Sequence, residues 1–266
     1  MKAQNSDFIK AHASVKHWVF LRGLSREQAH WGDFIQRCET ELGWSCYAID
    51  LPGFGTEHLR PSPFTIAEIR RDVQQRLPAD IIASGEAFGI VALSLGGMVA
   101  LDWLASSPDD IATAIFISTS SADCGLFKRL KLSALPPTLH ALLATSTKQQ
   151  ERAILRMVSN NNALHAELLE QWCHIRERRP ASKLNVIRQL IAASRFHSPS
   201  TDKFTNSNAY FISSRADRMV SYQCSKYLAK KYHHSLTLHD SAGHDLPIDD
   251  ADWLVGVFRQ LVVAAI

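Results

Sequence analysis

The sequence predicts an α/β protein with a mostly parallel central sheet, helices flanking both faces of the sheet, and a helical insertion. Two observations carry this prediction. Short apolar runs rich in β-branched and aromatic residues alternate with segments of helical periodicity, as in parallel strands joined by helical crossovers. The alternation stops between about Ser121 and Ser200, where the chain has helical patterns and prolines but no convincing strand.

The apolar runs are predicted to form the strands of the sheet. Most of them are apolar on both faces, which is typical of parallel strands buried between two layers of helices. In chain order they are His17–Arg22, Trp44–Ile49, Phe88–Leu93, Ala112–Ser118, Asn208–Ser213 and His234–His239.

The predicted helices fall into two groups. Those between the strands are Trp31–Leu42, Thr65–Leu77, Leu95–Ala105, Tyr222–Lys231 and Asp250–Val263. Those in the insertion are Pro137–Ala144, Lys148–Ser159, Asn162–Arg176 and Lys183–Ser194. We therefore expect a core domain made of residues 1–120 and 200–266, and a helical cap made of residues 121–199.

Composition and charge exclude several classes of protein. With 46% hydrophobic and 21% charged residues, the 266-residue chain has the usual mix of a globular protein, unlike a disordered one. Its 29 basic and 26 acidic residues give a net charge of only +3, so no nucleic-acid partner is expected. Because residues 1–16 are mostly polar and contain no apolar run, no secretory signal is expected, and no apolar stretch is suited to spanning a bilayer. The five scattered cysteines have no C-x-x-C spacing, which favours reduced thiols in the cytoplasm and indicates no metal site.

Ser94 is the predicted nucleophile. It lies in Ala92-Leu-Ser94-Leu-Gly-Gly97, directly after a predicted buried strand and at the start of a predicted helix. A serine on such a tight strand-to-helix turn is a nucleophile elbow, because the turn lifts its hydroxyl clear of the sheet. The turn requires small residues on both sides of the serine, here Ala92 and Gly96. The alternative for this position is an ordinary helix N-cap serine.

Two residues on later loops complete a candidate catalytic triad. His244 follows the last predicted strand, and its imidazole suits a general base because its pKa lies near neutrality. Asp217 follows the preceding strand and can accept a hydrogen bond from the second ring nitrogen. The chain order Ser94, Asp217, His244 belongs to one fold class. Asp123, after the fourth strand, is the alternative acid, whereas Asp245 is interpreted as a loop or helix-start residue.

An oxyanion hole requires two backbone N–H groups aimed at the developing negative charge. One is expected from Leu95, the residue after the predicted nucleophile. The other is expected from Leu24, on the loop after the first strand, where Gly23 lets the backbone turn. The loop Asp50–Gly55, after the second strand, is expected to be a structural tight turn.

In this order, the motifs resemble those of the α/β-hydrolase fold superfamily, in particular its small serine carboxylesterases with a helical cap. The matching segments are Leu21–Leu24, Asp50–Gly55, Ala92–Gly97, Arg215–Val220 and Gly243–Pro247. The resemblance implies the α/β-hydrolase fold, a small-molecule ester substrate and no cofactor.

The sequence departs from the family pattern at two positions. The usual glycine two residues before the elbow serine is Ala92, which is small enough for the turn. The usual histidine before the oxyanion glycine is Arg22. Its guanidinium either replaces the imidazole in a structural role or points into the cleft and binds an anionic part of the substrate.

The length, the helical cap and two of the motifs are similar to the esterase group that includes the pimeloyl-[acyl-carrier protein] methyl ester esterase. In that enzyme a basic cap surface engages the acidic carrier protein. The densest basic cluster of the predicted cap contains Arg178 and Arg179. The resemblance makes these arginines candidates for binding the substrate or a carrier protein. The alternative is a solvated helix end, where cations favour the terminal carbonyls.

The predicted activity is hydrolysis of a carboxylic ester through a Ser-His-Asp triad and an acyl-enzyme intermediate. The same fold and triad also host hydrolases of acyl-carrier-protein or CoA thioesters and methyl esters, C–C bond hydrolases, lyases and peroxidases. A ligand-binding relative is the non-enzymatic alternative. Apolar cap residues are the candidates for lining the substrate pocket, with packing between cap helices as the alternative. They are Leu135, Leu139, Leu142, Leu143, Met157, Leu168 and Trp172.

Overall fold

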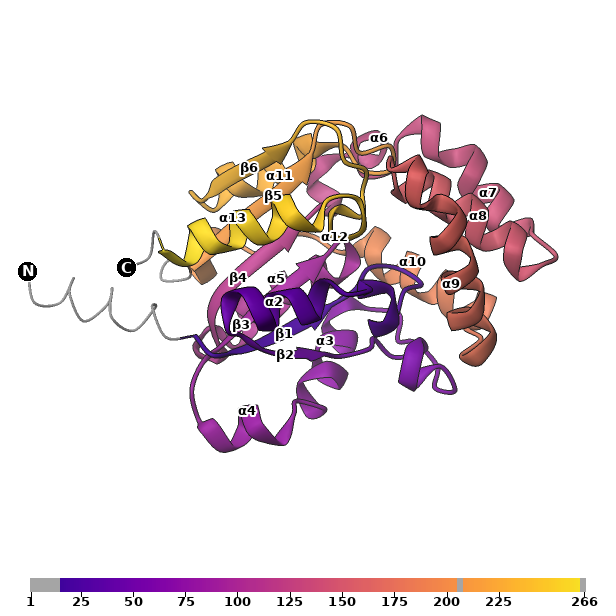
Figure 1. Cartoon of the computed structure of the whole chain (residues 1–266). Helices are drawn as coiled ribbons and strands as arrows, with labels where there is room; N and C mark the ends of the chain where they lie inside the picture. The colour runs from indigo at the N-terminus through magenta and orange to yellow at the C-terminus, as the bar shows by residue number, and fades with distance from the viewer. Residues whose placement is uncertain (1–14, 205–207, 264–266) are drawn as a thin grey trace, which may run out of the picture.

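The computed structural model describes residues 15–204 and 208–263, and these residues contain one six-stranded sheet. The strand order is β2-β1-β3-β4-β5-β6, and every neighbouring pair is parallel (Figure 1). The strands are β1 (His17–Leu21), β2 (Ser45–Ala48), β3 (Phe88–Leu93), β4 (Ile111–Ile117), β5 (Asn208–Ser214) and β6 (Ser235–His239). The predicted parallel sheet is confirmed.

Helices cover both faces of the sheet (Figure 1). Those interspersed with the strands are α2 (Phe34–Leu42), α3 (Ile66–Gln75), α4 (Ala79–Ser84), α5 (Leu95–Ser106), α11 (Tyr222–Lys231), α12 (Leu246–Asp249) and α13 (Ala251–Val263). The short helices α4 and α12 were not predicted, because neither is long enough to show a helical period. No described helix is long and apolar enough to cross a membrane.

Two apolar clusters hold the sheet between its helical layers. Side chains alternate between the two faces of a strand, so neighbouring residues of β1 join different clusters. Val19 and Leu21 pack with residues of α3, α5 and α11, whereas Trp18 and Phe20 pack with residues of α2 and α13. Every residue of β3 is buried, which agrees with its sequence being apolar on both faces.

Between β4 and β5, the residues that the structure describes form helices and no strand. These helices are α6 (Leu126–Arg129), α7 (Leu135–Leu143), α8 (Thr147–Val158), α9 (His165–Arg178) and α10 (Lys183–Arg195). They have an apolar cluster of their own, which includes Leu155, Met157 and Trp172. The helical insertion is therefore confirmed, and we call residues 121–199 the cap. The division of the chain into a core domain and a cap domain at these boundaries stays a prediction. Ala192 and Phe196, within the cap, pack into the apolar cluster of the sheet that contains Val19 and Leu21.

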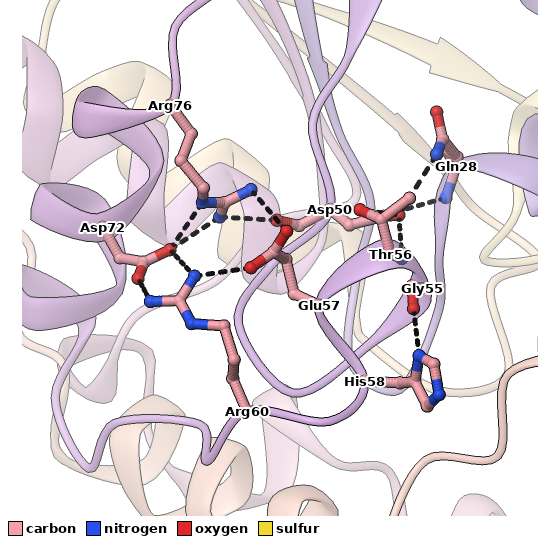
Figure 2. A network of polar contacts seen from close by, with 9 residues as sticks. All are labelled: Gln28, Asp50, Gly55, Thr56, Glu57, His58, Arg60, Asp72 and Arg76. Atoms are coloured by element: carbon pink, nitrogen blue, oxygen red, sulfur yellow. Dashed lines mark hydrogen bonds and ion pairs between the residues drawn. The ribbon is translucent and has the colours of Figure 1, made fainter.

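The loop after β2 is held by the carboxylate of Asp50, which is buried (Figure 2). This carboxylate accepts hydrogen bonds from the backbone N–H of Thr56 at 2.8 Å and from that of Gln28 at 2.6 Å. Arg76 donates to the Asp50 carbonyl oxygen at 2.8 Å and to Asp72 at 2.6 Å, which extends the network to α3. Because Gln28 lies just after β1, Asp50 connects two neighbouring loops at the carboxyl edge of the sheet. The contacts match the structural role expected for this loop.

Helix α5 closely approaches the end of β1, and Gly96 makes this approach possible. A Cβ atom on Gly96 would lie 2.5 Å from the carbonyl oxygen of Leu21 and 2.7 Å from that of Arg22. These are backbone atoms, which cannot rotate away as the end of a flexible side chain can. A glycine is therefore required at this position of the elbow by the space available.

We expect Gly96→Ala to lower the free energy of unfolding by about 1–3 kcal/mol, because the new methyl group would overpack a well-packed contact. Gly256 in α13 is the matched control, since nothing lies within 4 Å of the place its Cβ would occupy. Gly256→Ala is expected to raise the free energy of unfolding by about 0.5–1 kcal/mol. Urea unfolding followed by circular dichroism measures both, and equal effects of the two variants would contradict the argument.

Candidate active site

Ser94 lies at the sharp turn between β3 and α5. Its backbone angles are φ 57° and ψ −113°, and a positive φ is rare for a residue with a side chain. The turn is held by hydrogen bonds of its backbone: the Ser94 N–H donates to the Ile117 carbonyl at 2.8 Å, and the Ser94 carbonyl accepts from the Thr119 hydroxyl at 2.9 Å. The Ser94 side chain makes no capping hydrogen bond to α5, which speaks against the N-cap alternative. This is the geometry of a nucleophile elbow.

Asp217 and His244 are hydrogen-bonded to each other, although they follow different strands. His244 Nδ1 lies 2.7 Å from Asp217 Oδ2, and both residues are buried. The other oxygen, Oδ1, accepts hydrogen bonds from the backbone N–H groups of Met219 at 2.7 Å and Val220 at 2.9 Å. Asp217 is thus oriented by its own loop, and it in turn orients the imidazole. Among the described residues, His244 Nε2 has no hydrogen-bond partner.

The surroundings of His244 raise its pKa above the ordinary value of 6.5. Burial disfavours the imidazolium and lowers the pKa, and the charge of Arg22 acts in the same direction. The negative charge of Asp217, the hydrogen bond to it and the charge of Asp245 outweigh these effects. The protonated imidazole is therefore stabilised in this site, as a general base that receives a proton requires.

Asp123, the alternative acid, is engaged elsewhere. Its carboxylate lies 2.8 Å from His197 Nδ1 and accepts a hydrogen bond from the Ser198 N–H at 2.8 Å. The hydrogen bonds from Ser198 and His197 hold the pKa of this carboxyl well below its usual range, against the effect of burial. Asp123 fastens the chain near the end of the cap, and it is Asp217 that contacts His244.

Ser94 and His244 line one cavity of about 860 Å³, which includes the space open to solvent. The loop after β1 and the cap provide the rest of its wall. The other residues that line it are Arg22, Gly23, Leu24, Ser25, Arg26, Leu93, Leu130, Thr138, Ala141, Leu142, Gln150, Ile154, Met157, Val158, Val186, Leu190, Met219 and Asp245. The wall is thus mostly apolar on the cap side and polar near the loop after β1.

The apolar residues predicted to line the pocket divide into three groups. Leu142 and Met157 line the cavity. Leu168 and Trp172 pack among the cap helices, which was the alternative. The prediction was wrong for three leucines of α7, which are exposed to solvent because only one face of a helix can point at the cavity. They are Leu135, Leu139 and Leu143.

The two residues predicted to form the oxyanion hole lie near Ser94 on different segments. Leu24 lines the cavity, on the loop after β1. Leu95 is the first residue of α5, and the first N–H groups of a helix have no partner within the helix. Gly23 lets the two segments meet, since a Cβ there would lie 3.1 Å from the Cβ of Ser94.

Arg22 forms a buried ion pair that the sequence analysis missed. Its two terminal nitrogens donate to the two carboxylate oxygens of Asp245, at 3.0 Å and 2.5 Å. The guanidinium also lies over the Trp31 ring, 4.7 Å from its centroid. Because both terminal nitrogens are engaged, this geometry favours the structural role over contact with the substrate. The sequence places Arg22 just before Gly23 and Asp245 just after His244, but nothing in it indicates that the two side chains pair.

A second buried ion pair connects the loop after β1 to the cap. Arg26 Nη1 lies 2.7 Å from Glu151 Oε2 in α8 and 2.8 Å from His30 Nε2. Burial and the charges of Arg26 and Arg22 hold the pKa of His30 well below its usual range, so the imidazole is neutral and accepts a hydrogen bond. Nothing in the spacing of these residues indicated that they would meet.

The structure does not bring Arg178 and Arg179 to the cavity that contains Ser94. Arg178 is exposed at the end of α9. Arg179 donates to Glu27 Oε1 at 3.0 Å, on the other side of the loop after β1. Within the described parts of the chain, no group of three or more His, Cys, Asp or Glu side chains is placed to hold a metal ion.

Solved structures with the same fold span nearly the whole chain. A meta-cleavage product hydrolase from Pseudomonas fluorescens IP01 superposes with a TM-score of 0.75 at 15% identity, over 94% of this chain and 92% of that one. For 2-hydroxy-6-oxo-6-phenylhexa-2,4-dienoate hydrolase from Rhodococcus sp. strain RHA1, the TM-score is 0.72 at 18% identity, over 94% and 91% of the chains. A thermophilic esterase from Thermogutta terrifontis has a TM-score of 0.70 at 16% identity, over 94% and 90%.

At these identities the similarity establishes the fold alone. No curated protein matches the chain significantly. The model of the alpha/beta hydrolase family matches residues 18–257, which includes β2 to β6, all of β1 but its first residue, and the complete cap. The chain therefore belongs to the alpha/beta hydrolase family.

Proposed function

We propose that the protein is a serine hydrolase that cleaves a carboxylic ester through Ser94, His244 and Asp217. The observation that carries the proposal is the state of His244. Its Nδ1 is held 2.7 Å from the Asp217 carboxylate, its Nε2 has no partner among the described residues, and it lines the same cavity as Ser94. Since Nδ1 carries the proton donated to Asp217, Nε2 of the neutral imidazole holds the lone pair that can accept the serine proton.

The proposed reaction has two halves. Ser94 Oγ attacks the ester carbonyl while His244 Nε2 takes its proton, and the N–H groups of Leu24 and Leu95 stabilise the oxyanion. His244 then donates this proton to the oxygen of the leaving alcohol. The alcohol departs, and the acyl group stays bound to Ser94 as an acyl-enzyme. A water molecule, deprotonated by His244, attacks the acyl carbonyl; the bond to Ser94 Oγ then breaks, His244 returns the proton to Oγ, and the acid is released. The mostly apolar cavity wall supports an apolar substituent on the ester.

Hydrolysis of a C–C bond by the same three residues is the second candidate, because the fold resembles that of a meta-cleavage product hydrolase. Assays of the purified protein with p-nitrophenyl esters and with a vinylogous 1,5-diketone acid distinguish the two. Turnover of the diketone acid at a higher kcat/KM than any ester would favour the second candidate.

Docking of an acyl carrier protein on the cap is a subordinate proposal, supported by the exposed side chain of Arg178. Arg178→Glu is expected to raise the KM for an acyl-carrier-protein ester and to leave the KM for p-nitrophenyl butyrate unchanged. We also propose a cytoplasmic location, which the five free cysteines support.

Ser94→Ala is expected to lower kcat for p-nitrophenyl acetate and butyrate by about 10⁴–10⁶-fold, because the nucleophile is lost. The variant should also lose labelling by a fluorophosphonate probe. Ser118→Ala is the matched control: Ser118 is also buried at the end of a strand with a positive φ, on the neighbouring strand β4. Retained turnover in the Ser94 variant, or an equal loss in the control, would overturn the proposal.

The pKa of His244 is expected to lie above 6.5 in the Ser94→Ala protein and below 6.5 when Asp217→Asn is added. Asp217, the strongest influence in favour of the imidazolium, is then gone, and burial, the largest effect of all, together with Arg22 outweighs the remaining charge of Asp245. NMR titration of ¹³C-labelled histidines measures both values, with His244→Gln to assign the signal. In the enzyme with Ser94 intact, kcat/KM should accordingly fall as the pH drops through a value above 6.5. An unchanged pKa would contradict the role given to Asp217.

The Arg22–Asp245 pair is tested by a double-mutant cycle. Arg22→Met alone is expected to lower the free energy of unfolding by about 3–5 kcal/mol, because it leaves a buried carboxylate without its partner. Adding Asp245→Leu should recover most of this loss, since the uncompensated charge is removed as well. Chemical unfolding of these two variants and of Asp245→Leu alone completes the cycle, and additive losses would show that the pair has no structural coupling.

A further inference from the structure

The outer surface of the cap carries exposed apolar side chains on α6, on the turn before α7, and on α7 itself. Each is between 45% and 70% exposed. They are Leu126, Phe127, Leu132, Leu135, Leu139 and Leu143. Scattered exposed leucines are ordinary, but a group of them along one short stretch of chain marks an interaction surface. We call this group the α6–α7 surface.

Helix α7 has two different apolar faces. Leu135, Leu139 and Leu143 are spaced four residues apart, so they form a stripe along the exposed side of the helix. Thr138 and Leu142 lie on another face and line the cavity of Ser94. The same helix therefore forms part of the cavity wall and presents leucines to the outside. Figure 1 shows α7 and α8 together at the outer side of the cap, away from the strands.

The exposed charges of the segment from α6 to the end of α8 have one sign, and the exposed Asp123 just before α6 is paired with His197. From residue 126 to residue 158 the only acidic residue is Glu151, which is completely buried against Arg26. The same stretch exposes Lys128 and, on α8, a series of cations with a spacing of four residues. These cations are Lys148, Arg152 and Arg156. The combination of exposed leucines, exposed cations and no exposed carboxylate is typical of helices that lie at the surface of an anionic membrane.

We propose that the α6–α7 surface docks on an anionic lipid bilayer, with its leucines in the headgroup region and the cations of α8 near the phosphates. The chemistry favours lipid over protein, because residues 126–158 expose apolar side chains and cations but no carboxylate. Docking would place the α7 wall of the cavity against the membrane. An ester dissolved in the bilayer would then be the substrate class, a consequence that rests on the proposed hydrolase function, whereas docking itself does not.

The test is sedimentation of the purified protein with sucrose-loaded vesicles of phosphatidylcholine, with and without phosphatidylglycerol. We expect sedimentation with the phosphatidylglycerol vesicles, and much less at high salt or with phosphatidylcholine alone. The variant Leu135→Ser/Leu139→Ser/Leu143→Ser is expected to bind about tenfold or more weakly. The matched control is Leu59→Ser/Ile82→Ser, which removes exposed apolar side chains outside the cap.

Charge is tested separately from apolar contact. Lys128→Glu/Lys148→Glu should lower binding to phosphatidylglycerol vesicles, whereas Lys16→Glu/Lys230→Glu, at exposed positions outside the cap, should not. Circular dichroism melting checks that each variant is folded. Sedimentation measures binding directly, so the result does not depend on an enzymatic activity. The proposal is overturned if wild type stays in the supernatant with both vesicles, or if the leucine variant binds like wild type. It is also overturned if light scattering shows a dimer that the leucine variant converts to a monomer, since the surface would then be an interface between two copies.

Discussion

The parallel direction of the strands is the constraint on which the rest of this structure depends. Because every strand runs the same way, the loops that follow β1, β3, β5 and β6 all emerge at one edge of the sheet. Residues far apart in the sequence therefore meet there: Ser94 after β3, Asp217 after β5 and His244 after β6. The elbow is possible only because α5 approaches the end of β1 at a position without a side chain, Gly96.

Buried ion pairs give this edge its fixed arrangement. Arg22 and Asp245 connect the loop after β1 to the loop of His244, and Arg26 and Glu151 connect the same loop to the cap. Burying a charge costs several kcal/mol, and an ion pair in the interior contributes little net stability over apolar residues of similar size. What such a pair does provide is geometry, because a bidentate guanidinium–carboxylate contact allows one relative position of its two loops. The loop of Leu24 is thus held from both sides.

The cap differs from the core in how it uses its apolar residues. In the core, both faces of a central strand such as β3 are buried, so its apolar side chains contact other apolar side chains and no solvent. In the cap, a small cluster around Trp172 holds the helices together, while α7 divides its apolar residues between the cavity and the solvent. A thin layer of helices can have a functional surface on each side, because neither side has to provide the main hydrophobic core.

The sequence by itself determined the six strands and the longer helices along the chain, the helical insertion and the position of Ser94 between a strand and a helix. The range predicted for β3 and that for α11 agree with the structure at both ends, because apolar periodicity and turn residues are local properties. Only the tertiary structure decided which residues meet across long separations: Asp245 with Arg22, and Glu151 with Arg26. It also decided that three leucines of α7 face outward. The reason is physical: periodicity shows that a helix is amphipathic, but the neighbouring elements decide what each of its faces contacts.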